Sequence, residues 1–288
     1  MKIFHNCYTD SVLFSVRNLN VGFKGQLISN PSPDTTVSMC GNLKDARGLM
    51  IRKIFICVLE EFTRSNHYSK TNPVVQTREV YINIESFLTD NGYSIILSDQ
   101  TKKANYIKYL KKQLKASLCM LSTMEVRKAT PAGVSVVGVV EKFYIKNNDA
   151  YVFLDQRFAE ELVKSSLTVI PDEVKKISGK HLYALLISIK LCDQYYKTSN
   201  EKKGTNTKIG VEKIFNALPT DLNSLIERDR RHWRITIKEL VASNLNYLKG
   251  IILKDWHYEC AKGKFVDINS ITSPYEYLKE AYIRFDLL

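Results

Sequence analysis

Six lysines lie between residues 102 and 115, and no acidic residue lies among them. Ile107, Leu110 and Leu114 recur at helical spacing, which predicts a helix with an apolar back and a basic front. Such a helix fits the major groove of DNA, where ammonium groups bind phosphates and amides can reach sugars or bases. The other interpretation of a charge run is a solvated helix face. The predicted DNA contacts are Lys102, Lys103, Asn105, Lys108, Lys111, Lys112 and Lys115, with Tyr106 and Gln113 as further candidates for bases or sugars.

A second basic cluster precedes another predicted helix, in the stretch ERDRRHWRITIKELVASNLNYLKG. Arginine suits phosphate because its planar guanidinium donates two parallel hydrogen bonds. Trp233 and Trp256 flank this helix among apolar residues, so packing is the main interpretation and base stacking the alternative. The predicted DNA contacts here are Arg228, Arg230, Arg231, Arg234, Lys238, Asn244 and Lys249.

The same order of elements is predicted in both halves of the chain, and each half contains one of these clusters. In the first half, a helix from Leu43 is followed by the strand EVYINI, a short helix ending at Asn91-Gly92, and the lysine-rich helix. The runs VSVVGVVEKFYI and AYVFL then predict a β-hairpin over 134–154, turning at Asn147 to Asp149. Asp155 is the expected N-cap of the next helix.

In the second half, a helix from about Ser178 is followed by the strand TKIG, the helix VEKIFNALP and the helix 236–249. IILKDWHYEC and KFVDI predict a hairpin over 251–268, and a final helix from Pro274 is expected to close the chain. The order helix, strand, helix, helix, hairpin is that of a helix-turn-helix with a β wing.

The predicted fold class is therefore α+β, mainly helical, with two tandem winged-helix domains. The predicted divisions are residues 1–42, an N-terminal segment of unknown role, then 43–165 and 166–288 as the two domains. Within the first segment, SVLFSVRNLNVGF alternates like one or two strands, and SNPSPDTT, residues 29–36, predicts a loop.

The overall charge supports a polyanionic partner. The chain of 288 residues carries 42 Lys and Arg against 30 Asp and Glu, a net charge of +12. Its six cysteines form no CxxC pair and are expected to be small buried hydrophobes in a reducing cytoplasm. The opening residues do not resemble a secretion signal, and no apolar run is long enough to span a membrane, so no membrane partner is expected.

No catalytic motif is found in the sequence. A P-loop, a GxSxG elbow and an HExxH helix are all missing, and no His-x-His pair occurs among the five histidines. Adjacent acids such as Glu60-Glu61 point in different directions from a helix, which disfavours a metal-dependent nuclease. We therefore expect no catalytic residue, no metal site and no cofactor.

The stretch RRHWRITIKELVASNLNYLKGIILKDWHYE resembles the C-terminal module of plasmid and phage replication initiators, with its Trp-Arg-Ile start and its Trp-x-Tyr strand. SLTVIPDEVKKISGKHLYALLISIKLCDQYY also resembles the opening helix of their second winged helix. The resemblance covers the range 75–260 in layout but only a part of that range by motif, and the segment 1–42 has no match. It implies binding to repeated double-stranded DNA at an origin, recruitment of host replication proteins such as the helicase, and possible homodimers.

Three other classes of protein stay open at this point, and the metal-dependent nuclease is the one that the sequence supports least. A winged-helix transcriptional regulator would share every feature described so far. A protein-binding adaptor would bind its partner without the steep salt dependence that many phosphate contacts produce.

Overall fold

The structure is a computed structural model that divides into two compact units, unit 1 (Met1–Thr168) and unit 2 (Val169–Leu288). Helices and small antiparallel sheets give an α+β fold in both units. The described residues are 1–15, 24–32, 34–42, 48–67, 69, 71–93, 100–178, 181–199, 207–218, 226–227, 234–260, 262, 264, 267 and 270–288.

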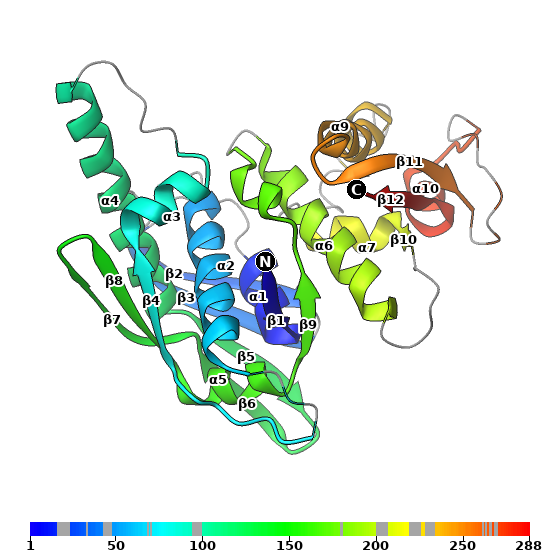
Figure 1. Ribbon diagram of the computed structural model, residues 1–288. Helices are drawn as coiled ribbons and strands as arrows, with labels where there is room; N and C mark the ends of the chain where they lie inside the picture. Colours follow the sequence, from blue (N-terminus) through cyan, green and yellow to red (C-terminus); the bar gives the residue numbers. More distant parts are fainter. Residues whose placement is uncertain are drawn as a thin grey trace. The chain divides into compact units, whose positions relative to one another are not determined.

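The N-terminal residues belong to a four-stranded antiparallel sheet of unit 1, with strand order β2-β3-β5-β6 (Figure 1). Two of its strands come from the segment 1–42, and the other two follow the long helix α4 much later in the chain. A further two-stranded sheet joins β1 to β9. The elements are β1 (Lys2–His5), α1 (Cys7–Ser15), β2 (Lys24–Ser32), β3 (Thr35–Asn42), α4 (Gln100–Ser122), β5 (Glu125–Thr130), β6 (Gly133–Gly138) and β9 (Ser166–Val169).

Two predictions for the N-terminal residues are wrong. The described part of the expected strand, SVLFS, is the second half of α1, where Val12 and Leu13 are buried. This helix begins because the Asn6 side chain accepts hydrogen bonds from the backbone N–H groups of Tyr8 and Thr9, at 2.9 and 3.0 Å. The expected loop over residues 29–36 instead lies largely within β2 and β3.

The other elements of unit 1 follow the predicted order of helix, strand, helix, helix and hairpin. Their sheet has the order β4-β8-β7. The Asn83 side chain caps the second helix by accepting from Ser86 N, and this helix ends at Asn91, before Gly92 with its φ of 73°. The elements, with α4 between the second helix and the hairpin, are α2 (Gly48–Ser65), β4 (Glu79–Asn83), α3 (Ile84–Asp90), β7 (Val140–Lys146), β8 (Asp149–Leu154) and α5 (Gln156–Val163).

The predicted hairpin over 134–154 is only partly right. β7 and β8 pair around a turn in which Asn147 has φ 55°, as the Asn147 to Asp149 signal predicts. Residues 134–138, however, belong to β6, which pairs with β5 in the other sheet. The chain changes sheets at Val139, whose N–H donates to Met124 O and whose carbonyl accepts from Asp155 N.

Unit 2 has a three-stranded antiparallel sheet with the order β10-β12-β11, which repeats the pattern of β4-β8-β7 (Figure 1). Helices precede and separate its strands, and the order is the predicted one as far as β11. The elements are η1 (Asp172–Lys176), α6 (Leu182–Ser199), β10 (Lys208–Gly210), α7 (Val211–Ala217), the π-helical turn η3 (Arg234–Lys238), α9 (Glu239–Leu248), β11 (Leu253–Glu259), α10 (Pro274–Glu280) and β12 (Tyr282–Leu287).

The predicted hairpin over 251–268 and the predicted closing helix are both wrong. β11 pairs with β12 at the end of the chain, while Lys264 and Asp267 lie outside strands and Phe265, Val266 and Ile268 are outside the described residues. The helix from Pro274 ends at Glu280. Residues 282–287 then alternate, with Ile283 and Phe285 buried, because one face of this strand closes the core of unit 2.

We predict that Phe285→Ala lowers the free energy of unfolding of unit 2 by about 3 kcal/mol, since it removes a fully buried ring from the central strand of its sheet. Asp286→Ala changes an exposed neighbour and should stay within about 0.5 kcal/mol. Urea denaturation followed by circular dichroism measures both. Equal stability of the two variants would contradict the position of Phe285 in the core of unit 2.

Candidate nucleic-acid interface

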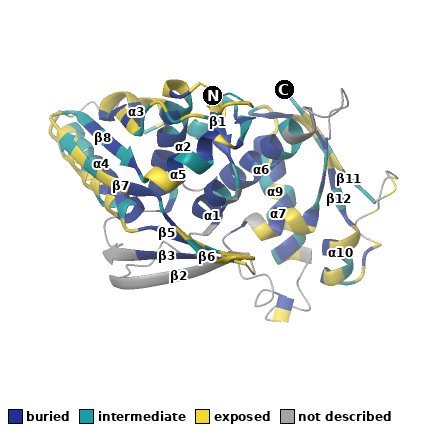
Figure 2. Ribbon diagram, turned by 90° about the horizontal axis from the view of Figure 1, so that it is seen from below, coloured by how far each residue is buried: buried dark blue, intermediate teal, exposed yellow. Residues whose placement is uncertain are grey.

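Helix α4 holds its lysines outward because its other side is buried. Leu110, Leu114 and Leu118 are at most 2% exposed and lie in the core of unit 1, where α4 contacts α2. Lys108, Lys112 and Lys115 follow at spacings of four and three residues, so their ammonium groups share one side of the helix. Figure 2 shows this alternation of buried and exposed residues along α4.

The lysine face is defined by Lys108, Lys111, Lys112 and Lys115. Lys111 is half-buried and the other three are exposed. Among the described residues, no ion pair involves Lys108, Lys111 or Lys115. Unit 1 contains 22 Lys and Arg against 15 Asp and Glu, and six of those 22 are on α4, which has no acid. The positive charge of unit 1 is therefore concentrated on this helix.

The remaining residues predicted on α4 divide into exposed and buried ones. Lys102 and Asn105 are exposed, and Lys103 and Tyr106 are half-buried. Gln113 is 5% exposed and donates from Nε2 to the Tyr109 hydroxyl at 2.6 Å, so it faces the protein and cannot reach a base. Tyr109 is 44% exposed, but it was not among the predicted contacts. The sequence could have indicated it, because Tyr109 directly follows Lys108 in the same basic helix.

The end of α3 is held by a buried lysine of α2. Lys53 is 2% exposed and donates from Nζ to Asn91 O, at the end of α3, at 2.6 Å. The same ammonium lies 5.1 Å from the centre of the Tyr93 ring. Burial lowers the pKa of Lys53 from 10.5 to about 8, because an ammonium loses its hydration there. This contact fixes the end of α3 against α2.

The β7–β8 hairpin brings further cations to unit 1, and β7 contacts α4. Lys142, Lys146 and Asn147 are all exposed. Lys142 Nζ lies 4.9 Å from the centre of the Phe153 ring, which places it over β8. The sequence predicted this hairpin as a wing, but Lys142, Lys146 and Asn147 were not among the predicted contacts. Alternation along the strand, which sends every second residue outward, was the signal that could have identified them.

In unit 2, the structure does not describe most of the predicted arginine cluster. Arg228, Arg230, Arg231 and Trp233 lie outside the described residues, as does the side chain of Arg234.

The described members of the second set are largely engaged within the protein. Asn244 donates from Nδ2 to Leu240 O at 2.6 Å. Lys249 Nζ is 2.5 Å from Asp255 Oδ1, and this ion pair holds the pKa of Asp255 below its usual value. Lys238 is half-buried. The structure therefore does not bring this set together as a free basic surface among the described residues.

The aromatic residues beside α9 pack as expected. Trp256 is half-buried, meets Tyr258 edge-on at 5.2 Å between ring centres, and donates from Nε1 to Asn246 Oδ1 at 3.0 Å. His181 stacks on Tyr247 with ring centres 3.8 Å apart. These contacts fit the packing interpretation of Trp256.

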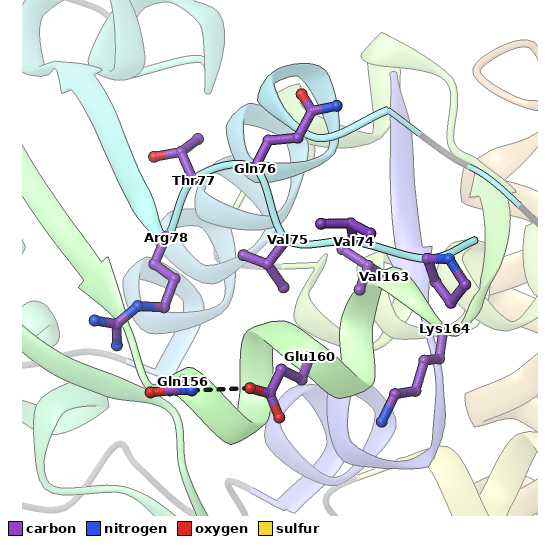
Figure 3. Close-up of a pocket in the computed structure, with 10 residues that line it drawn as sticks. Val74, Val75, Gln76, Thr77, Arg78, Gln156, Glu160, Val163 and Lys164 are labelled. Atoms are coloured by element: carbon purple, nitrogen blue, oxygen red, sulfur yellow. Dashed lines mark hydrogen bonds between the residues drawn. The ribbon is translucent and has the colours of Figure 1, made fainter.

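A pocket of about 560 Å³ lies elsewhere in unit 1 (Figure 3). The extended segment Pro73–Arg78 and helix α5 line it, and Gln156 Nε2 donates to Glu160 Oε1 at 3.0 Å across its floor. No residue of the lysine face lines it. Within the described ranges, no cluster of His, Cys, Asp and Glu could hold a metal ion, and no helix there is long and apolar enough to cross a bilayer.

No protein-family model matches the chain, and no curated protein matches it. Among solved structures, the chain is similar to the crystal structure of domains 2 and 3 of RctB. That similarity covers 96% of this chain and 98% of that chain, at 10% sequence identity and a TM-score of 0.48.

We predict that Lys53 makes stability depend on pH. Between about pH 8 and pH 10.5 the unfolded chain binds this proton and the folded chain does not, so stability rises with pH by up to about 3 kcal/mol. Urea denaturation at pH 7 to 10.5 should show the rise in the natural chain and in Lys108→Met, which alters an exposed lysine, but not in Lys53→Met. An unchanged rise in Lys53→Met would exclude Lys53 as its source.

Proposed function

We propose that this protein binds double-stranded DNA in a sequence-specific way through two winged-helix domains, one in each unit. In this proposal α2, β4, α3, α4 and the β7–β8 hairpin make the first domain. α6, β10, α7, α9 and the β11–β12 pair make the second. The repeated strand order, β4-β8-β7 and β10-β12-β11, supports the same topology in both.

The observation that carries the proposal is the lysine face on α4. It is the third helix of the first domain, which is the position of the recognition helix in a helix-turn-helix. Its ammonium groups neutralise phosphates, while Asn105 and Tyr109 offer polar contacts to sugars or base edges. Lys142, Lys146 and Asn147 on the hairpin contribute wing contacts to the adjacent backbone. In unit 2, the arginines at 228, 230, 231 and 234 and Lys238 remain the proposed contacts.

The biological role that we propose is initiation of replication at a plasmid or phage origin, in the cytoplasm and without enzymatic activity. The motif resemblance in residues 230–259 supports this role over regulation of transcription. The partners in this proposal are repeated origin DNA and the host proteins that load the helicase.

The experiment that tests the role is binding of the purified protein to fragments of its own replicon, at several salt concentrations and with competitor DNA. Preference for a repeated segment beside the gene supports initiation. Preference for a single promoter site would favour a transcriptional regulator. Binding without salt dependence would contradict a DNA-binding role and favour a protein adaptor.

We predict that replacing Lys108, Lys111, Lys112 and Lys115 by Ala weakens DNA binding on the order of a hundredfold at moderate salt. The slope of log K against log salt should become shallower by about 3 to 4, since each lost phosphate contact removes about one released counterion. Fluorescence anisotropy with a labelled duplex measures both.

The matched control replaces four exposed lysines elsewhere, Lys164, Lys176, Lys213 and Lys279, and so changes the net charge equally. Equal losses in the two variants would mean that net charge, rather than the lysine face, governs binding. An unchanged affinity in the folded α4 variant would remove α4 from the interface.

A further inference from the structure

Two neutral polar side chains, Asn105 and Tyr109, lie next to the lysine face on α4. They are four residues apart, so they project from the same side of the helix, about 6 Å apart along its axis. Asn105 is exposed and Tyr109 is 44% exposed. Because neither side chain is charged, the attraction that draws lysine to phosphate does not act on them. In a helix that lies in the major groove, such side chains are suited to the edges of the bases.

The hydroxyl of Tyr109 is held by a buried amide. Gln113 is 5% exposed, and its Nε2 donates to the Tyr109 hydroxyl at 2.6 Å. A tyrosine hydroxyl can both accept and donate a hydrogen bond. Because the hydroxyl of Tyr109 accepts from Gln113, its own hydrogen is left to donate to an acceptor outside the helix.

The surroundings of Tyr109 differ from those of the exposed Tyr81 in one respect. The Tyr81 hydroxyl donates to Asp149 Oδ1 at 2.7 Å, so its hydrogen is already used within the protein. Helix α4 has no acidic residue that could take the hydrogen of Tyr109 in the same way. Tyr109 is therefore suited to donate to a bound molecule.

Base edges in the major groove differ in what they offer to such a donor. Guanine presents two acceptors, N7 and O6, whereas cytosine presents its N4 amino group, which is a donor. A hydroxyl that donates outward therefore favours guanine and disfavours cytosine. The amide of Asn105 offers a donor and an acceptor together, which matches N6 and N7 of adenine. Bases on one strand rise by about 3.4 Å, so the two side chains are separated by roughly one or two base steps.

We propose that Asn105 and Tyr109 determine the base sequence that α4 binds. Asn105 reads adenine, and Tyr109 reads guanine one or two bases away and excludes cytosine from that position. Gln113 is a positioning residue, because its buried amide acts on the base only through the hydroxyl of Tyr109. The inference rests on the proposed DNA-binding function and adds the base composition of the bound site. The lysine face keeps the phosphate contacts, which carry no sequence information.

The test is selection by the full chain from a pool of duplex oligonucleotides with a randomised central segment, followed by sequencing of the bound fraction. The natural chain should select adenine and guanine at the stated spacing. Tyr109→Phe removes only the hydroxyl, so discrimination against cytosine at the guanine position should fall about tenfold while the adenine preference stays. Asn105→Ala should lose the adenine preference and keep the guanine preference.

Gln113→Glu tests the direction of the hydrogen bond. The introduced carboxylate accepts the hydrogen of the Tyr109 hydroxyl, which leaves the hydroxyl oxygen as an acceptor toward the DNA. The selected base at this position should then change from guanine to cytosine, with the adenine position unchanged. A helix that was merely disturbed would lose affinity without this exchange.

Thermal unfolding verifies the fold of each variant. If the buried carboxylate prevents folding, Gln113→Met replaces it, because methionine has a similar size and forms no comparable hydrogen bond. The guanine preference of this variant should then weaken toward that of Tyr109→Phe. An unchanged guanine preference in the folded Gln113 variants would overturn the role of Gln113.

Lys115→Met is the control, because Lys115 is exposed on the lysine face. It should weaken binding to all sequences alike and reduce the salt slope by about 1, with the selected sequence unchanged. Equal selection by the natural chain, Tyr109→Phe and Asn105→Ala would overturn the inference and leave DNA binding by α4 intact, as would binding without any base preference. A natural chain that binds no duplex would overturn the proposed function, and this inference with it.

Discussion

The burial of one side of α4 determines what the other side can do. Leu110, Leu114 and Leu118 are buried away from water in the core of unit 1. Their burial fixes the rotation of the helix about its own axis. Once that rotation is fixed, the lysines cannot turn inward, and their mutual repulsion is tolerated because each ammonium stays hydrated. The core therefore determines the rotation of the basic surface.

Local signals allowed much of unit 1 to be predicted. Asn91-Gly92 ends α3 and Asp155 caps α5 by accepting from Arg157 N and Phe158 N, as their sequence contexts indicate. The turn at Asn147 is likewise a property of a few adjacent residues. The division of VSVVGVVEKFYI between two sheets could not be read in this way. Both strands are rich in β-branched and aromatic residues, and they differ in their partners, because β6 forms a hairpin with the preceding β5 and β7 forms one with the following β8.

The candidate site shows the same limit. Helical periodicity correctly places Lys108, Lys112 and Lys115 outside, and it could also have shown that Gln113 shares a buried stripe with Ser117 and Leu121. The pairing of Lys249 with Asp255 depends on how α9 meets β11, which no local pattern encodes. The row of Tyr81, Tyr151 and Tyr144 across β4, β8 and β7 was not predicted, because only the register of the sheet brings these three residues together.

The pairing of β3 with β5 has a consequence for how the chain is made. Val37 lies opposite Val126 in this sheet, so β3 meets its partner β5 only after the helices between them have been synthesised. During translation β2 and β3 can form a hairpin, but one edge of that hairpin stays open until β5 emerges from the ribosome. Formation of this sheet therefore requires closure of a long loop, because α2, β4, α3 and α4 lie between β3 and β5 in the sequence.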